Sequence, residues 1–172
     1  LISIKHLKEL NGIEVKDDHL IIGAAVTFKQ IINNSTIQKH YPLLVSACSL
    51  IGSTQIRNQA TIAGNLVNAA PCADSAPPLL IDNAEIVLKS FEGERSVKLA
   101  DFIIRSYKTI IKPNELVTHI KIPMDKTQDK FFYHYFQLGR RNALNITRVS
   151  VCAKAAFNED QNITNIRIAA GS

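Results

Sequence analysis

The sequence has no tryptophan, a single methionine and only three cysteines, Cys48, Cys72 and Cys152, which are widely spaced. An odd number of cysteines without a C-x-x-C pair argues against a disulfide framework. The same pattern argues against a zinc or iron–sulfur site held by this chain alone. We therefore expect no metal site in the chain, and the cysteine usage favours a cytoplasmic location.

Long hydrophobic runs are also missing. No apolar stretch approaches the roughly 18 residues that a membrane-spanning helix requires, so no membrane span is expected. The opening LISIKHLKEL lacks the basic region and long apolar stretch of a secretory signal. Hydrophobic residues make up 46% and charged residues 20% of the chain, which is typical of a globular protein.

An excess of positive charge is present but not concentrated. The formal net charge is +5, and the one local basic cluster is formed by Arg140, Arg141 and Arg148. Lysines and arginines are otherwise spread along the chain, and no recognisable nucleic-acid module surrounds them. We therefore expect no nucleic-acid partner.

Hydrophobic patterns and turn signals predict an α+β chain. A strand is expected over residues 19–28, where Thr27 and Gln30 form a candidate capping box for a short helix. Pro42 suits the first turn of a buried helix that runs into Gly52. A short helix is expected at residues 76–80, and further strands are expected at residues 84–90, 95–99, 116–122, 131–138, 147–157 and 163–170.

The polar and charged residues 124–130 are interpreted as a linker. It divides the chain into a unit over residues 1–123 and a second unit over residues 131–172. Three antiparallel strands without covering helices leave one face unpacked. The second unit is therefore expected to be incomplete.

The most distinctive segment is QIRNQATIAGNLVNAAPCAD at residues 55–74, which is rich in Ala, Gly, Asn and Thr. It is predicted as a loop. Gly64 lacks a Cβ and Ala63 has the smallest one, while Asn65 and Asn68 tolerate left-handed backbone angles, so successive amides can turn toward one anion. A phosphate or pyrophosphate is the expected ligand; the alternative is a tight turn under a helix with no ligand near it.

Three short motifs carry a family resemblance: QIRN at 55–58, ATIAGN at 60–65, and the pairs AP and AD at 70–71 and 73–74. Together with NELVTHIKIP and FYHYFQLGRRNALNITRVSVCA, they resemble the FAD-binding (medium) subunits of molybdenum hydroxylases. That family includes xanthine dehydrogenase, nicotinate dehydrogenase and aerobic carbon monoxide dehydrogenase. The resemblance covers essentially the whole chain. It implies the second subdomain of a p-cresol methylhydroxylase-like FAD-binding domain, with an antiparallel or mixed sheet and flanking helices, followed by the start of a small antiparallel C-terminal domain.

The resemblance also implies a set of FAD contacts. The residues over 61–65 match the loop along the pyrophosphate and ribityl chain, although the family more often has two glycines where this chain has Ala63 and Gly64. Asp74 matches a carboxylate that hydrogen-bonds to the sugar region, and Ile51 matches an apolar wall near the adenine. The full expected set is Ile51, Thr61, Ile62, Ala63, Gly64, Asn65, Asp74, Leu116, Phe136 and Arg148.

Several of these residues also have ordinary structural explanations, which the sequence leaves open. Asp74 is a candidate N-cap for the turn over residues 75–80. Arg148 suits a position near the flavin ring, where positive charge stabilises the anionic reduced form, or a solvated strand end. Phe136 suits a wall beside the ring or simple core packing. No catalytic side chain is expected, because the chemistry belongs to the flavin.

In this family the flavin subunit receives electrons from a [2Fe–2S] cluster on a partner subunit and passes them to NAD⁺ or another acceptor, beside a molybdopterin-binding subunit. Two alternatives remain open: a non-catalytic interaction module with weak or no flavin binding, and an independent flavin oxidase of the same superfamily. The family carries a second glycine-rich loop upstream, whereas only Gly12, Gly23 and Gly52 precede residue 55 here. The resemblance therefore implies a piece of a longer subunit that lacks its N-terminal subdomain and half of the cofactor clamp.

Overall fold

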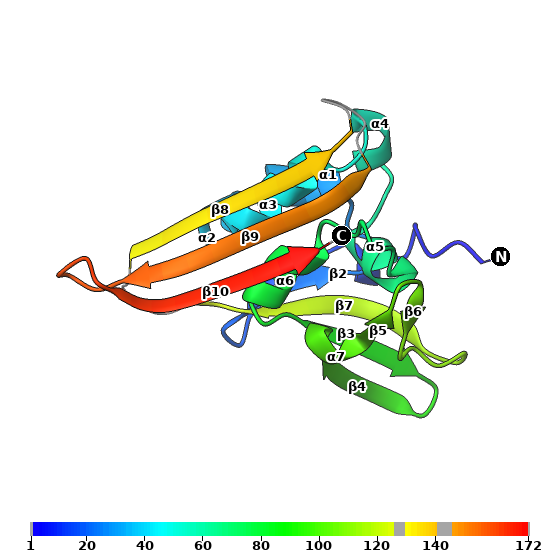
Figure 1. Ribbon diagram of the computed structural model, residues 1–172. Helices are drawn as coiled ribbons and strands as arrows, with labels where there is room; N and C mark the ends of the chain where they lie inside the picture. The colour runs from blue at the N-terminus through cyan, green and yellow to red at the C-terminus, as the bar shows by residue number, and fades with distance from the viewer. Residues whose placement is uncertain (1, 126–129, 141–145, 172) are drawn as a thin grey trace.

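The computed structural model of the chain describes residues 2–125, 130–140 and 146–171. A five-stranded sheet, a three-stranded sheet and a group of short helices between them make up most of this part of the chain (Figure 1). The smaller elements are η1 (Lys8–Leu10), α7 (Leu99–Phe102), and a two-stranded ribbon of β5 (Ile103–Arg105) and β6 (Lys108–Thr109).

The five-stranded sheet is antiparallel throughout and has the order β1-β2-β7-β3-β4. Its strands are β1 (Ile13–Lys16), β2 (His19–Gly23), β7 (Leu116–Pro123), β3 (Glu85–Ser90) and β4 (Gly93–Lys98). Alternate residues point to one face of a strand, and those facing the helices are buried. The sheet thus offers one apolar face, formed by Leu20, Ile22, Ile86, Leu88, Ile120 and Ile122.

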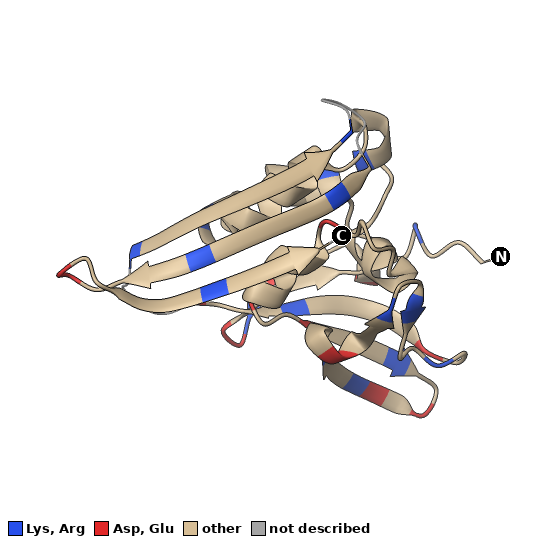
Figure 2. Cartoon of the chain, in the orientation of Figure 1, with Lys and Arg blue, Asp and Glu red and all other residues tan. Residues whose placement is uncertain are grey.

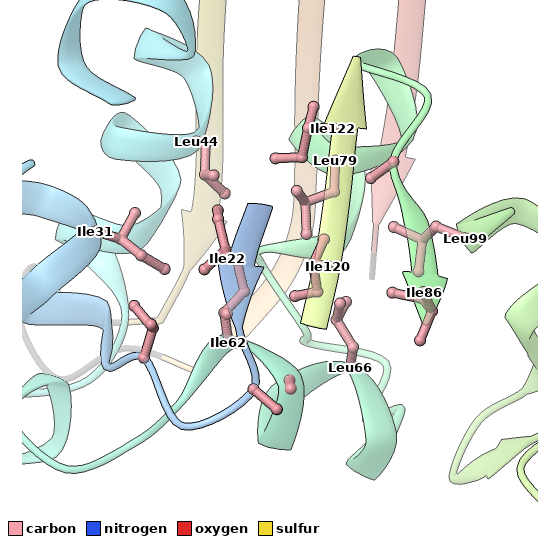
Figure 3. Close-up of a cluster of buried hydrophobic side chains, with 14 of the residues drawn as sticks. Ile22, Ile31, Leu44, Ile62, Leu66, Leu79, Ile86, Leu99, Ile120 and Ile122 are labelled. Atoms are coloured by element: carbon pink, nitrogen blue, oxygen red, sulfur yellow. The ribbon is translucent and has the colours of Figure 1, made fainter. Parts of the chain in front are cut away.

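Short helices cover that face. They are α1 (Phe28–Asn33), α2 (Ser35–His40), α3 (Pro42–Leu50), α5 (Ile62–Asn68) and α6 (Ala76–Ile81). Figure 3 shows Ile31 and Leu44 from the helices meeting Ile22 of the sheet in the main core. None of the helices among the described residues is long and apolar enough to cross a membrane.

Two local predictions for this region are confirmed and one is wrong. Thr27 and Gln30 form the capping box of α1, and Pro42 occupies the first turn of α3. The strand expected over residues 19–28 is shorter, because β2 ends at Gly23. The amide of Val26 turns back to the carbonyl of Gly23, which ends the strand ahead of the cap.

The three-stranded sheet has the order β10-β9-β8. Its strands are β8 (Lys130–Gly139), β9 (Thr147–Phe157) and β10 (Ile163–Gly171), so the three strands expected at the end of the chain are confirmed. The sheet packs on α3 and α6 through a small cluster of Leu43, Ile81 and Cys152. The predicted linker includes residues 126–129, which lie outside the described residues, so the division into two units stays a prediction.

The other face of this sheet is apolar and exposed. Phe136 pairs with Val151 and Leu138 pairs with Val149, and all four side chains are exposed. Lysine and arginine are isolated along the strands (Figure 2). In the described part of the chain, no helix covers this outer face of the three-stranded sheet, which agrees with the expected unpacked face.

Candidate cofactor site

Half of the segment expected to be a loop is helical. Residues 55–74 contain most of α4 (Thr54–Arg57) and all of α5 (Ile62–Asn68). Thr61 is the N-cap of α5, and its hydroxyl accepts a hydrogen bond from the amide of Gly64 at 3.1 Å. Ile62 and Leu66 are buried in the main core. The loop prediction was wrong because the cap and the burial of one helix face outweigh the low helix propensity of Gly and Asn.

The backbone amides at the start of α5 are mostly engaged within the protein. The amide of Ile62 donates to the carbonyl of Val26 at 3.2 Å, and the amide of Asn65 donates to the carbonyl of Thr61 at 3.0 Å. Among the described residues, the amide of Ala63 has no hydrogen-bond partner. The expectation that successive amides turn together toward one anion is therefore not met, and Ala63 offers a single free donor at this turn.

The side chain of Asn65 is held in place by a residue that sequence reasoning missed. Ser75 is fully buried, and its hydroxyl donates to Oδ1 of Asn65 at 2.7 Å. This contact uses the oxygen of the Asn65 amide and leaves its two N–H donors for another acceptor. Asn65 and Ala63 therefore carry donors in the first half of α5, on either side of the exposed Gly64, and Ala63 itself is 4% exposed.

Asp74 lies at the junction between the helices and the three-stranded sheet, and it is 5% exposed. Its Oδ1 accepts a hydrogen bond from the Tyr135 hydroxyl at 3.0 Å. Its Oδ2 accepts from Gln137 Nε2 at 2.9 Å and from the Thr147 hydroxyl at 2.6 Å. The alternative that Asp74 caps the next helix is wrong, because the N-cap of α6 is Ser75 and it has no side-chain capping bond.

The electrostatics of this junction favour further hydrogen bonding. Burial raises the pKa of the Asp74 carboxyl, and the hydrogen bonds from Thr147, Tyr135 and Gln137 oppose that rise. Burial and the nearby Asp74 also raise the pKa of the Tyr135 hydroxyl, which keeps it a neutral donor. A carboxylate has about four acceptor positions, of which the three donors use three. Counting only the residues that the structure describes, one position on Oδ1 has no donor and can accept from a group such as a sugar hydroxyl.

The other expected contacts are less closely grouped. Ile51 is half-buried at the end of α3, where its carbonyl accepts from the Arg57 guanidinium at 2.9 Å. Leu116 begins β7 and is exposed. Arg148 is exposed on β9, as the strand-end alternative predicted. Arg141 lies outside the described residues.

Phe136 lies on the opposite face of β8 from the two residues that hold Asp74. Tyr135 and Gln137 precede and follow it, and side chains alternate between the faces of a strand. Phe136 is 53% exposed, so the alternative that it is simple core is wrong. The Ser75 contact therefore ties the residue next to Asp74 to Asn65 of α5, whereas Phe136 lies on the outer face.

Sequence reasoning also missed Tyr135, Gln137 and Thr147. The only local signal was a polar Gln137 two positions from Tyr135 within an aromatic strand, which places both on one face. Elsewhere in the part of the chain that the structure describes, no group of three or more His, Cys, Asp or Glu side chains is placed to hold a metal ion.

Comparison with known proteins places this geometry in a family. Residues 1–125 match the family model of the FAD binding domain in molybdopterin dehydrogenase. The chain is 35% identical over 172 residues to a xanthine dehydrogenase FAD-binding subunit of Escherichia coli O157:H7, covering 99% of this chain and 58% of that protein. It is 35% identical over 150 residues to the nicotinate dehydrogenase FAD-subunit of Eubacterium barkeri, covering 86% of this chain and 50% of that protein.

Among solved structures, a carbon monoxide dehydrogenase from Hydrogenophaga pseudoflava matches with a TM-score of 0.87 and 26% sequence identity, covering 95% of this chain and 55% of that one. The chain thus spans between 50% and 58% of the length of these relatives. The expected α+β fold is confirmed by this match. From the family model and the identity along the whole chain, it follows that the protein belongs to the FAD-binding subunit family of the molybdenum hydroxylases, with FAD as its cofactor.

Proposed function

We propose that this chain is the FAD-binding part of a molybdenum hydroxylase or dehydrogenase complex, passing electrons from [2Fe–2S] clusters through FAD to NAD⁺ or another acceptor. The observation that carries the proposal is the match of residues 1–125 to the FAD binding domain in molybdopterin dehydrogenase. The proposed partners are an iron–sulfur subunit and a molybdopterin-binding subunit. A cytoplasmic location belongs to the same proposal and is supported by the free thiols of Cys48, Cys72 and Cys152.

The residues present fit a flavin dinucleotide. The free amide of Ala63 and the side-chain donors of Asn65 lie beside Gly64, where an exposed backbone without a Cβ allows a phosphate oxygen to approach. Asp74 supplies an acceptor for a ribityl or ribose hydroxyl. Donors for the diphosphate and an acceptor for the sugar are both needed by a ligand of this kind.

The division of labour follows from these contacts. When bound, the flavin supplies the electron-transfer chemistry, while the protein binds and orients it. We propose that the α5 residues hold the diphosphate and that Asp74 holds the sugar chain. Ile51 and Leu116 would form apolar walls, and Phe136 and Arg148 stay predicted contacts on the three-stranded sheet. The complete proposed set at the start of α5 is Thr61, Ile62, Ala63, Gly64 and Asn65. Ala63 and Asn65 would supply donors and Gly64 the approach, whereas Thr61 and Ile62, whose polar groups are engaged within the protein, would hold the turn in place.

The test is flavin binding by the full chain. Purification under gentle conditions, followed by titration with FAD, should give the visible absorbance of bound flavin and quenching of its fluorescence. The Asp74→Asn variant should bind FAD more weakly, whereas Asp101→Asn, at an exposed position in α7, should bind as the wild type does.

A contrary result would be a colourless wild-type chain that does not take up FAD. If such a chain still bound an iron–sulfur or molybdopterin subunit in a pull-down, the alternative of a non-catalytic interaction module would replace the proposal. A chain that binds FAD but captures neither partner subunit in the same pull-down would instead support an independent flavoprotein.

A further inference from the structure

The buried carboxylate of Asp74 is held from outside the region that matches the FAD domain. That match covers residues 1–125, whereas the three donors to Asp74 in the described part of the chain are Tyr135, Gln137 and Thr147. They lie 61, 63 and 73 positions along the chain from Asp74. An acceptor of the FAD domain is thus oriented by the three-stranded sheet.

The three donors fix the carboxylate in one orientation. Tyr135 and Gln137 share one face of β8, and Thr147 begins β9, whose backbone pairs with that strand. Gln137 Nε2 also contacts the hydroxyl of Thr147, so the two groups on Oδ2 restrain one another. Among the described residues only Tyr135 donates to Oδ1, so the second acceptor position of that oxygen has no donor from this part of the chain.

Loss of a donor would change what Asp74 can accept. A buried carboxylate without hydrogen-bond partners favours its neutral form, because burial penalises the charge. A neutral carboxyl carries a proton and is a poorer acceptor for a sugar hydroxyl. The donors therefore maintain both the direction and the acceptor character of the Asp74 oxygens.

We propose that Tyr135, Gln137 and Thr147 are positioning residues for FAD, which make flavin affinity depend on docking of the three-stranded sheet. This inference rests on the proposed function, in which Asp74 contacts the cofactor. It assigns to the sheet a role in cofactor binding that does not require any of its three donors to touch the flavin.

The experiment measures FAD affinity of the full chain by fluorescence quenching, for the Tyr135→Phe and Thr147→Val variants. Each change removes one hydroxyl and keeps the shape of the side chain. Each should weaken FAD binding about tenfold, as expected for a lost hydrogen bond to a charged group. Thr147→Ser, which restores the hydroxyl, should recover most of the affinity and the wild-type flavin absorbance spectrum.

Tyr133→Phe is the matched control. Tyr133 lies two positions before Tyr135 on the same strand face, and its hydroxyl has no hydrogen-bond partner among the described residues. This variant should bind FAD as the wild type does. Thermal unfolding of each variant without FAD identifies any that fail to fold.

A double-mutant cycle separates positioning from general destabilisation. If Tyr135 acts through Asp74, then Tyr135→Phe should have little further effect on affinity in the Asp74→Asn background. Additive losses, or unchanged affinity in both hydroxyl variants while Asp74→Asn binds weakly, would overturn the inference. A wild-type chain that binds no FAD would instead contradict the proposed function itself.

Discussion

Thr61 and Gly64 show how one residue pair decides the start of α5. The Thr61 hydroxyl caps the helix by accepting from the Gly64 amide. A Cβ on Gly64 would lie 2.9 Å from that hydroxyl oxygen, which is too close for an undisturbed cap. The glycine of the ATIAGN motif therefore has a local structural reason as well as the proposed role of admitting a phosphate.

Removing the cap should destabilise the protein. Thr61→Ala leaves the Gly64 amide without its acceptor and should lower the free energy of unfolding by about 1 kcal/mol. Thr61→Ser keeps the hydroxyl and should lose much less. Urea denaturation measures both variants, and equal stability of the Ala and Ser variants would contradict a capping role.

Gly23 is required for a different reason. A Cβ at this position would lie 2.2 Å from the carbonyl oxygen of Leu10, and that neighbour is backbone that cannot rotate away. Gly23→Ala should therefore cost about 1–3 kcal/mol of stability or more. Gly12→Ala is the control, because no atom lies within 4 Å of a Cβ there. Similar denaturation midpoints for the two variants would show that the backbone near Leu10 relaxes freely.

At the scale of elements, an ion pair ties β4 to the turn ahead of β7. Arg95 Nε donates to Glu115 Oε1 at 2.6 Å and its Nη2 donates to Oε2 at 2.9 Å. The amide of Lys112 donates to the same carboxylate at 2.8 Å. The hydrogen bonds from Arg95 and then from Lys112 lower the pKa of Glu115 to about 2.

This pKa sets a pH dependence of stability. Because the folded state holds the pKa of Glu115 below its ordinary value of 4.5, the carboxylate stabilises the fold above that value. This contribution to the free energy of unfolding should fall as the pH drops below 4.5 and should be lost once the pH is below the folded-state pKa of about 2. The wild type should therefore exceed Glu115→Gln in stability at neutral pH, and the two should converge in acid.

Denaturant titrations at several pH values measure this difference. Glu92→Gln, in the exposed turn between β3 and β4, is the control and should differ little from the wild type at any pH. A Glu115→Gln deficit that stays constant down to pH values near 2 would contradict the assignment of the effect to this carboxylate.

Local signals predicted most elements, and the failures have a common cause. The Thr27 capping box, Pro42 at the start of α3 and the last three strands follow from residues a few positions apart. The helical nature of residues 62–68 depends on burial of Ile62 and Leu66 in a core whose other residues come from distant parts of the chain. Sequence periodicity alone does not reveal such tertiary support.

The candidate site was predictable only in part, for the same reason. The family motifs pointed to Asp74 and to residues 61–65, but the partners of Asp74 lie on strands 61 or more positions away. Ser75 is next to Asp74 in sequence, yet its contact with Asn65 depends on how α5 and α6 fold against one another. Contacts of this kind follow from the assembled fold and not from spacing.

At the scale of the whole molecule, the two sheets are held together by a small apolar cluster and by polar contacts. The cluster of Leu43, Ile81 and Cys152 is far smaller than the main core. Near it, the Lys154 ammonium contacts Asp82 at 3.1 Å and lies 4.5 Å from the centre of the Phe131 ring. Docking of the three-stranded sheet should therefore depend strongly on a few polar side chains.

Lys154 provides the sharpest test of that dependence. Asp82 is almost fully buried, so Lys154→Met would leave a carboxylate without its main counter-charge. Breaking a buried pair in this way should cost about 3–5 kcal/mol. The damage should be greatest at the junction, so amide hydrogen exchange should accelerate in β8, β9 and β10 before it does in β2, β7 and β3.

A second change distinguishes loss of the pair from loss of packing. Adding Asp82→Asn to Lys154→Met removes the stranded charge, and it should restore part of the stability and slow exchange in the three-stranded sheet. If the double variant is as unstable as the sum of the two single variants, the ion pair contributes little and the apolar cluster alone holds the sheets together. Slow exchange in β8–β10 would report that the sheet is docked, and docking keeps the Tyr135, Gln137 and Thr147 contacts with Asp74. The proposed function therefore predicts that flavin affinity recovers together with the stability.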